Sequence, residues 1–378
     1  MSGSTYGNIF KITTWGESHG KGLGVVVDGC PAGLPLDETF IQGYLNRRRP
    51  GGIKYSTPRK ESDTVSILSG VLEGRTTGTP ISMAVMNESQ RSSDYSEIAS
   101  YYRPGHADYT LDAKYGFRDY RGGGRSSGRE TIGRVAGGAV ALALLKELGI
   151  HITAYAKAIG PVTFNEALFT NSQGHRFAPS WEQIAKSPLY LPDAEASRQA
   201  EDYLKEQMAK GDSAGGIIEC IISGVPAGIG EPVFDKLDAC LAKSILSIGA
   251  VKGFEIGSGF ACASMEGSRH NDSFQAKEDG SVIKKTNHSG GILGGISDGS
   301  DIIFRAAIKP TPSISLLQDT INQSHENLQV SIKGRHDPII VPRAVVVVEA
   351  MAAVALADLL LENMASRMDF VKKFYTLF

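Results

Sequence analysis

Short stretches of alternating or β-branched apolar residues recur along the chain and predict β-strands. Residues 9–14, 23–27, 81–86 and 302–309 have this pattern, which is typical of strands with one buried face. Residues 65–72, 151–163 and 215–223 are also predicted to be extended. Turn-rich segments with glycine and proline separate these runs, so we expect a substantial amount of sheet.

Between the strands the apolar residues follow a helical period. Asp37 is placed as an N-cap before an apolar helical face, and Pro50-Gly-Gly is expected to end that helix. Further helices are predicted over residues 130–148, 194–210, 232–248 and 345–364. Pro232 would occupy a favourable first-turn position. The helix over 130–148 carries small residues at Gly133, Gly137 and Gly138, which would let another element pack close to it.

The order of these elements predicts the fold class. Strands and helices are mixed without strict βαβ alternation, so an α+β fold with antiparallel sheets and flanking helices is expected. We find no internal repeat and no Pro/Ser-rich linker. One domain over residues 1–378 is therefore predicted.

Composition and charge narrow the classes of partner. The chain has 41% hydrophobic and 21% charged residues with a net charge of −2, which gives no reason to expect a nucleic-acid or membrane partner. The apolar run over 344–361 contains Glu349 and Asp358 and is predicted to be a buried helix. The four cysteines are scattered, and the first residues lack the pattern of a secretory signal. Free buried thiols and a cytoplasmic location are expected.

The segments Arg103-Pro-Gly-His-Ala-Asp and Asp119-Tyr-Arg-Gly-Gly-Gly-Arg-Ser-Ser-Gly-Arg-Glu hold the strongest chemical signal. They place a histidine, serines and arginines around glycines just before a predicted helix. Glycines allow close approach of a ligand, and a helix N-terminus with arginines favours anions. Ser127 and Glu130 also match a capping box. A cap and an anion site are compatible, and the ligand interpretation is favoured.

Other polar clusters are less specific. The loop over 16–22 contains Ser18 and His19 but lacks P-loop spacing. The basic segment over 47–60 either complements a helix end or clamps a polyanion, and both interpretations stay open. Polar glycine-rich segments lie over 287–299, 309–315 and 333–338 and could form the edge of a cofactor site. No spacing of metal ligands is found.

Three strings of residues resemble the chorismate synthase family. They are Thr14-Trp-Gly-Glu-Ser-His-Gly, Arg103-Pro-Gly-His-Ala-Asp with Tyr120-Arg-Gly-Gly-Gly-Arg-Ser-Ser, and Lys333-Gly-Arg-His-Asp-Pro. The resemblance covers essentially the whole chain. It implies a lyase of the shikimate pathway of aromatic amino acid biosynthesis, which converts 5-enolpyruvylshikimate-3-phosphate to chorismate and phosphate by 1,4-anti elimination. It also implies reduced FMN without net redox, a β-α-β sandwich fold and a homotetramer.

The resemblance assigns chemical roles to five residues. It implies that His19 acts on the departing phosphate and that His106 protonates the reduced flavin. Ser18 and Ser127 would support these histidines by hydrogen bonds. Asp337 is placed near the flavin N5 as a helper in taking up the substrate proton. A histidine with a pKa near neutrality suits such proton transfers.

The resemblance also assigns nucleotide contacts. Its FMN positions are Arg125, Ser126, Ser127, Gly249, Ala250, Gly294, Lys309, Pro310, Thr311, Pro312, Ser313 and Arg335. Arg48 and Lys54 match its nicotinamide-nucleotide positions. Lysine at 54, where many members have arginine, keeps the charge but loses the bidentate fork. Whether NADPH reduces the flavin on this chain or an external flavin reductase does so stays open.

Two other classes of function compete with the lyase. The same pocket would suit a flavin-dependent oxidoreductase, which net flavin oxidation would reveal. The arginine–glycine tract resembles RNA-binding tracts, but it is single and runs into a predicted helix, and the chain has balanced charge.

Overall fold

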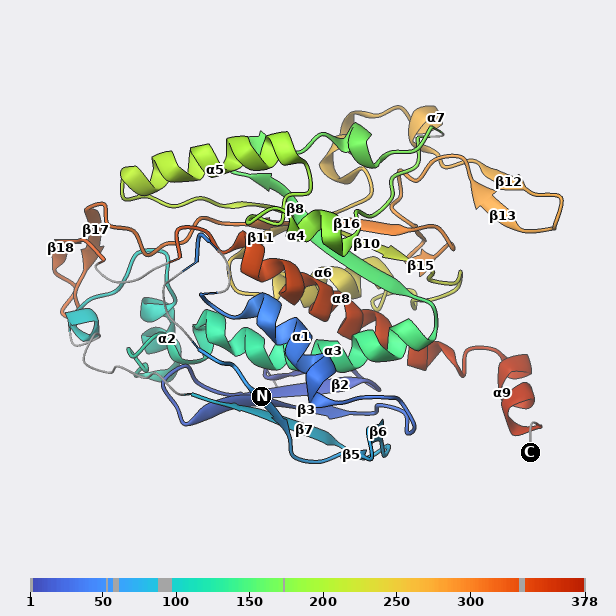
Figure 1. Cartoon of the computed structure of the whole chain (residues 1–378), viewed down its shortest axis with the longest axis horizontal. Coiled ribbons are helices and arrows are strands. Elements are labelled where there is room, and N and C mark those ends of the chain that lie inside the picture. Colours follow the sequence, from blue (N-terminus) through green and yellow to red (C-terminus); the bar gives the residue numbers. More distant parts are fainter. Residues whose placement is uncertain are drawn as a thin grey trace.

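Two five-stranded antiparallel sheets enclose a layer of helices (Figure 1). The computed structural model describes residues 3–51, 54–56, 61–87, 97–172, 174–332 and 337–376. All strand pairs in this part of the chain are antiparallel. The predicted α+β class and the β-α-β sandwich are therefore confirmed.

The first sheet is built mostly from the N-terminal residues. Its order is β1 (Thr5–Tyr6), β2 (Lys11–Gly16), β3 (Gly22–Asp28), β7 (Ile81–Met86) and β4 (Val65–Ile67). In β7, Ile81, Met83 and Val85 are buried while the residues between them are less so, as the alternating pattern predicts. The strand predicted over 65–72 is broken: it divides into β4 and the separate hairpin of β5 (Val71–Leu72) and β6 (Arg75–Thr76). Gly70, with φ of 82°, lies at the break.

The second sheet comes from the rest of the chain. Its order is β11 (Val251–Ile256), β16 (Ile302–Ile308), β10 (Gly216–Ser223), β8 (His151–Ile159) and β9 (Val162–Thr163). The strands predicted over 151–163, 215–223 and 302–309 correspond to β8 with β9, to β10 and to β16.

The helices between the sheets form the centre of the core. They are α1 (Glu38–Arg48), α3 (Thr131–Glu147), α6 (Leu237–Leu246) and α8 (Val341–Asn363). Helix α3 packs on β2, β3 and β7, while α8 packs on β8 and β10 (Figure 1). A Cβ atom added to Gly138 in α3 would lie 2.6 Å from Ala350 Cα of α8. The predicted close packing at the small residues of α3 is confirmed.

The remaining elements lie around this sandwich. They are α2 (Asp108–Tyr115), α4 (Trp181–Ala185), α5 (Ala194–Ala209), α7 (Gly267–His270), α9 (Met368–Tyr375), β12 (Phe274–Ala276), β13 (Val282–Lys284), β14 (Ile292–Leu293), β15 (Ile296–Ser297), β17 (Gln318–Ile321) and β18 (Asn327–Val330). Figure 1 shows α5 along the outer side of the second sheet and α9 standing off beside the C-terminus.

Two predicted helix boundaries differ from the structure, one at a tertiary contact and one at a proline in the first turn. The helix predicted from Pro232 begins only at Leu237, whose N–H donates to Gly295 O at 2.8 Å. The helix predicted from Val345 begins earlier, at Val341, with Pro342 in its first turn, where a missing N–H costs no hydrogen bond. The N-cap at Asp37 is confirmed by a 2.7 Å bond from Phe40 N–H to Asp37 Oδ1.

Helix α8 carries two buried carboxylates that have partners. Asp358 accepts hydrogen bonds from the N–H groups of Asn8, Ile9 and Phe10 at 2.8, 2.7 and 2.9 Å. Glu349 accepts from Ala154 N–H at 3.0 Å and pairs with Arg47 at 2.7 Å. Within the described residues α8 is the one helix with the length and composition of a membrane span, and 83% of its apolar window is buried in the molecule. The predicted buried helix is confirmed.

The cysteines differ in exposure. Cys30 and Cys220 are buried, Cys240 is half-buried and Cys262 is exposed. All four are free thiols, as expected, but the expectation that they are buried is wrong for Cys262, which lies in a surface 3₁₀ turn over Gly259–Ser264.

Candidate active site

Ser18 and His19 lie in the turn between β2 and β3, against the glycine-rich loop. Both side chains are buried. Ser18 Oγ lies 3.2 Å from His19 Nδ1 and donates to Gly122 O at 3.4 Å. Gly122 has φ of 64°, and a Cβ atom there would lie 2.5 Å from His19 Cε1 and 2.8 Å from Ser18 Oγ. The imidazole can occupy this place because residue 122 lacks a side chain.

Arg125 connects the glycine-rich loop to β2 of the first sheet by hydrogen bonds. Its guanidinium donates to Gly16 O at 3.1 Å, to Thr14 O at 3.3 Å and to Thr14 Oγ1 at 2.7 Å. Ser126 Oγ donates to Gly123 O at 2.7 Å. The polar side chains of the loop therefore bond it to β2 and to its own backbone.

Ser127 caps a short 3₁₀ turn, Gly128–Glu130, that precedes α3. Its Oγ accepts from Arg129 N–H at 3.4 Å. The predicted capping box with Glu130 is wrong, because the Glu130 carboxylate instead takes Arg134 one turn further on at 2.8 Å. This is a favourable i,i+4 pair.

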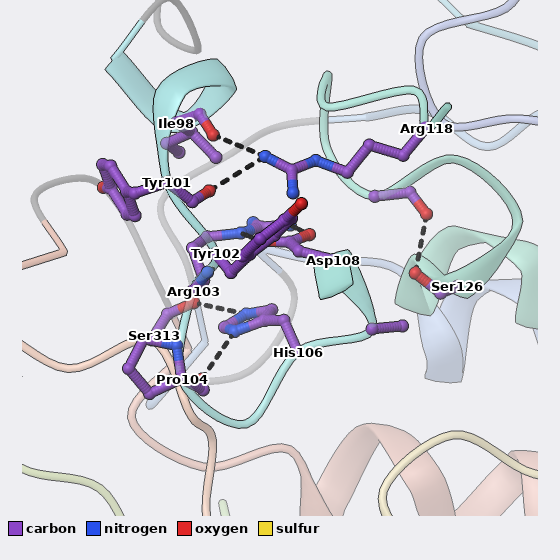
Figure 2. A network of polar contacts seen from close by, with 12 residues as sticks. Ile98, Tyr101, Tyr102, Arg103, Pro104, His106, Asp108, Arg118, Ser126 and Ser313 are labelled. Carbon is purple, nitrogen blue, oxygen red and sulfur yellow. Dashed lines mark hydrogen bonds and ion pairs between the residues drawn. The ribbon is translucent and has the colours of Figure 1, made fainter. Parts of the chain in front are cut away.

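His106 joins two segments that are far apart in sequence. Figure 2 shows its ring between Pro104 and Ser313, with Nδ1 3.0 Å from Pro104 O and Nε2 3.0 Å from Ser313 Oγ. Lys309 Nζ donates to Gly105 O at 2.6 Å, and Lys309 N–H donates to Ala250 O at 3.0 Å. The structure thus brings His106 together with the predicted cofactor segments 249–250 and 309–313.

A buried ion pair supports the loop that carries His106. Arg103 donates to Asp108 from Nε and Nη2, both at 2.8 Å, and from its backbone N–H at 3.0 Å. Burial alone would raise the pKa of Asp108, but the hydrogen bonds and charge of Arg103 outweigh it and hold that pKa below its usual value. Arg118 donates to the carbonyls of Ile98 and Tyr101 at 3.0 and 2.9 Å (Figure 2). These contacts fix the loop from both sides.

A third group of charges surrounds Arg48, whose side chain is 1% exposed. Arg48 Nη2 lies 3.3 Å from Asp63 Oδ2, and Asp63 Oδ1 lies 3.2 Å from Arg129 Nη2. Arg343 donates to Arg48 O at 3.0 Å and pairs with Asp337, so Arg48 and Asp337 are brought together. None of the guanidinium nitrogens of Arg48 has a hydrogen-bond partner in the described part of the chain. Burial lowers the pKa of Arg48 to about 9, so a buried cation remains here at neutral pH.

The geometry gathers histidines, hydroxyls and cations in linked loops, and the comparison with known proteins agrees with it. A protein-family model described as chorismate synthase matches residues 10–361 of this chain. The chain belongs to the chorismate synthase family. It is therefore a lyase.

Relatives of this family are similar over their whole length. Chorismate synthase of Lachnoclostridium phytofermentans is 71% identical over 375 residues, which cover 99% of this chain and 100% of that protein. Chorismate synthase of Methanosarcina mazei is 54% identical over 364 residues, 96% of this chain and 97% of that protein. A crystal structure of chorismate synthase superposes with a TM-score of 0.75 at 33% identity, covering 98% of this chain and 97% of that one.

The family resemblance assigned nucleotide contacts to three further positions. In the described part of the chain, no contact joins them to the residues around His19, His106 or Arg48. Lys54 is 60% exposed and pairs with Glu201 at 2.8 Å. Gly294 lies in the turn between β14 and β15 with no heavy atom near its Cβ position. Arg335 lies outside the described residues, with the neighbouring part of the Lys333-Gly-Arg-His motif. The nucleotide contacts at these positions stay predictions.

Several supporting residues were not singled out from the sequence. Asp63 and Arg343 hold Arg48 and Asp337, and Asp108 and Arg118 hold the His106 loop. Asp108 belongs to the segment Arg103-Pro-Gly-His-Ala-Asp but had no role assigned, and Arg118 directly precedes the glycine–arginine segment. Among the described residues, no group of histidine, cysteine or carboxylate side chains gathers as metal ligands.

His106 is held neutral by its surroundings. Burial, followed by the charge of Arg103 and, more weakly, that of Lys309, lowers its pKa to about 4, although the Pro104 carbonyl opposes the shift. A neutral imidazole is a poor proton donor, so the predicted protonation of flavin needs a bound anion that offsets these cations.

The lowered pKa of His106 predicts a pH dependence of stability. Between its unfolded pKa and the folded value, the unfolded chain binds a proton that the native site does not, so stability is lost as pH falls. From about pH 7 to about pH 5 the wild type should lose about 2 kcal/mol more unfolding free energy than His106→Gln. Urea unfolding at both pH values measures this difference. The exposed His151 gives the control His151→Gln, which should follow the wild type. Equal losses in all three proteins would contradict the assignment.

Proposed function

We propose that the chain catalyses the 1,4-anti elimination of phosphate from 5-enolpyruvylshikimate-3-phosphate to give chorismate. A C–O bond to phosphate and a C–H bond break, a second ring double bond forms, and phosphate and a proton leave. The observation that carries the proposal is the convergence of Ser18–His19 with Gly122 and of His106 with Ser313 and Lys309, in a chain of this family.

The charges support a substrate with one phosphate and two carboxylates. Arg48 is buried and pairs with Asp63 at 3.3 Å, but its guanidinium makes no hydrogen bond to the described residues, and Arg129 pairs with the same carboxylate at 3.2 Å. We propose that these cations face the substrate, in place of the nicotinamide nucleotide that the resemblance gives to Arg48. Buried cations of this kind are stabilised by a bound anion and bind phosphate or carboxylate in a fixed direction. In the proposal His19 donates a proton to the departing phosphate oxygen, and Ser18 holds the ring through Nδ1. Stabilising a leaving group in this way lowers the barrier to C–O cleavage.

The residues around Lys309 and Thr311 fit a reduced flavin with a phosphate tail. Thr311 Oγ1 is buried and has no hydrogen-bond partner among the described residues, and an unpaired buried hydroxyl fits a ligand that supplies the missing bond. Lys309 and Ser313 add a cation and a second hydroxyl. Reduced FMN, when bound, would supply electron density to the reacting substrate without net redox.

The roles of the chain's own groups follow from their contacts. His106 holds its proton at Nδ1, which donates to Pro104 O, while Nε2 accepts from Ser313 Oγ, and the ring takes up a second proton only beside an anion. Asp337 is fixed by Arg343, so its carboxylate is oriented as a helper in moving the substrate proton. We place the nucleotide contacts of the family at Arg125–Ser127 and 249–250 as part of this proposal.

The remaining features of the proposal concern assembly and electron supply. We propose a cytoplasmic homotetramer, on the pattern implied by the family, with NADPH as the electron source either directly or through an external flavin reductase. Size-exclusion chromatography with light scattering tests the first point. Anaerobic reduction of FMN by NADPH with the purified chain tests the second.

Anaerobic turnover tests the proposed reaction. With reduced FMN the chain should release one phosphate per chorismate formed while the flavin spectrum stays reduced, and without reduced FMN release should stop. Phosphate release and flavin absorbance are measured together. Oxidation of one flavin per product would instead support the oxidoreductase, and release without flavin would contradict the cofactor requirement.

A further inference from the structure

Asn87 joins two parts of the candidate site from the end of β7. Its Nδ2 donates to Gly20 O at 2.8 Å and to Glu17 O at 3.1 Å, and its backbone N–H donates to Lys21 O at 3.1 Å. Its Oδ1 accepts from Arg129 Nη2 at 2.8 Å and Nε at 3.1 Å. Every polar atom of the carboxamide is therefore hydrogen-bonded: the amide nitrogen donates to one loop, and the oxygen accepts from one guanidinium.

This contact set requires an amide. Carbonyl oxygens only accept hydrogen bonds and a guanidinium only donates them, so the side chain between them must donate on one side and accept on the other. The turn that Asn87 holds is closed by Gly20 N–H to Glu17 O at 3.1 Å, and Ser18 and His19 are its two central residues. Both ends of the turn that presents His19 are thus bonded to one side chain.

We propose that Asn87 is a positioning residue that holds the His19 turn against Arg129. The inference rests on the proposed function, in which His19 serves the departing phosphate. Through Arg129, the turn is connected to Asp63 at 3.2 Å and from there to the buried Arg48 at 3.3 Å. The histidine for the leaving group and the cations for the anionic substrate are therefore placed by one continuous set of contacts.

The substitution Asn87→Asp tests the contacts with the turn separately from the contact with Arg129. The carboxylate keeps the size of the side chain and its pairing with Arg129, but an oxygen now faces the carbonyls of Glu17 and Gly20. The turn loses two donors and gains a repulsion. Since misplacing a catalytic group by about 1 Å costs about 100-fold, kcat should fall by about 100-fold. KM should change by less than about threefold, because the substrate-binding cations remain.

Asn87→Ala, which removes the side chain from both partners, should lower kcat and also raise KM, because Arg129 is then no longer held on the side of the turn. The exposed Asn327 on β18 gives the matched control Asn327→Asp, which adds the same charge away from these contacts. It should keep the wild-type kcat and KM.

A measurement without substrate keeps the inference separate from the proposed function. His19 is 9% exposed, so diethyl pyrocarbonate should modify it slowly in the wild type. In Asn87→Asp the rate, followed by mass spectrometry of the peptide containing His19, should rise several-fold at an unchanged melting temperature. An unchanged His19 rate, or equal kcat in Asn87→Asp and the control, would overturn the inference. If the wild type forms no chorismate, the proposed function fails while the His19 rate still decides the positioning role.

Discussion

Gly122→Ala should lower kcat for chorismate formation by about 100-fold. The new methyl group would lie 2.5 Å from His19 Cε1 and 2.6 Å from His19 Nδ1, so the imidazole must leave its place beside Ser18. An alanine at φ of 64° also costs about 1–2 kcal/mol of backbone strain. Steady-state kinetics with fully reduced FMN measure the loss.

The strain and the displacement of His19 can be separated by a control. Gly280 has φ of 80° in the exposed turn between β12 and β13, and no heavy atom lies within 4 Å of its Cβ position. Gly280→Ala therefore adds a comparable strain without touching the site, and it should leave kcat unchanged. Wild-type kcat in Gly122→Ala would show that the place of His19 against the loop does not matter for turnover.

Gly138→Ala should destabilise the fold by about 3 kcal/mol. Its Cβ would lie 2.6 Å from Ala350 Cα and 2.8 Å from Ala350 O, which are backbone atoms of α8 and cannot rotate away. The two central helices must therefore separate, and the contacts of both sheets with them loosen. Urea unfolding of the purified variant measures the change.

For a second glycine in a helix, Gly43, we expect the opposite effect on stability. Gly43 lies on the exposed side of α1, and nothing is within 4 Å of its Cβ position. Gly43→Ala should stabilise the chain by about 0.5–1 kcal/mol, since alanine loses less backbone entropy in a helix. Destabilisation by both substitutions, or by neither, would contradict the role given to the α3–α8 contact.

Local patterns in the sequence were sufficient for most of the fold. The alternation in β7 and the cap at Asp37 depend on neighbouring residues, and the small residues of α3 predict close packing without identifying the partner; each prediction is confirmed. The start of α6 could not be read in this way, because it is set by a hydrogen bond from Leu237 to Gly295. The sequence around Pro232 holds no sign of that contact.

The candidate site depended on contacts between distant residues. His106 and Ser313 are separated by 207 positions, and Ser18 and Gly122 by 104. The motifs and the family resemblance indicated these residues, but they did not predict which of them contact each other. Asn87 had no signal of its own, because an asparagine after a strand is ordinarily a turn residue. Its importance comes from two partners that only the folded chain brings to it.

The hydrogen bonds from Asn8, Ile9 and Phe10 to Asp358 have a consequence for the order of folding. They join residues as far as 350 positions apart, and α8, which carries Asp358, is also the helix that fills the space beneath the second sheet. While the chain is being synthesised, α3 is available early to cover the first sheet, but the strands of the second sheet are made before α8, which packs on β8 and β10. The apolar face of the second sheet therefore stays uncovered until α8 has emerged from the ribosome. Such a chain completes its core late and is prone to aggregate before release.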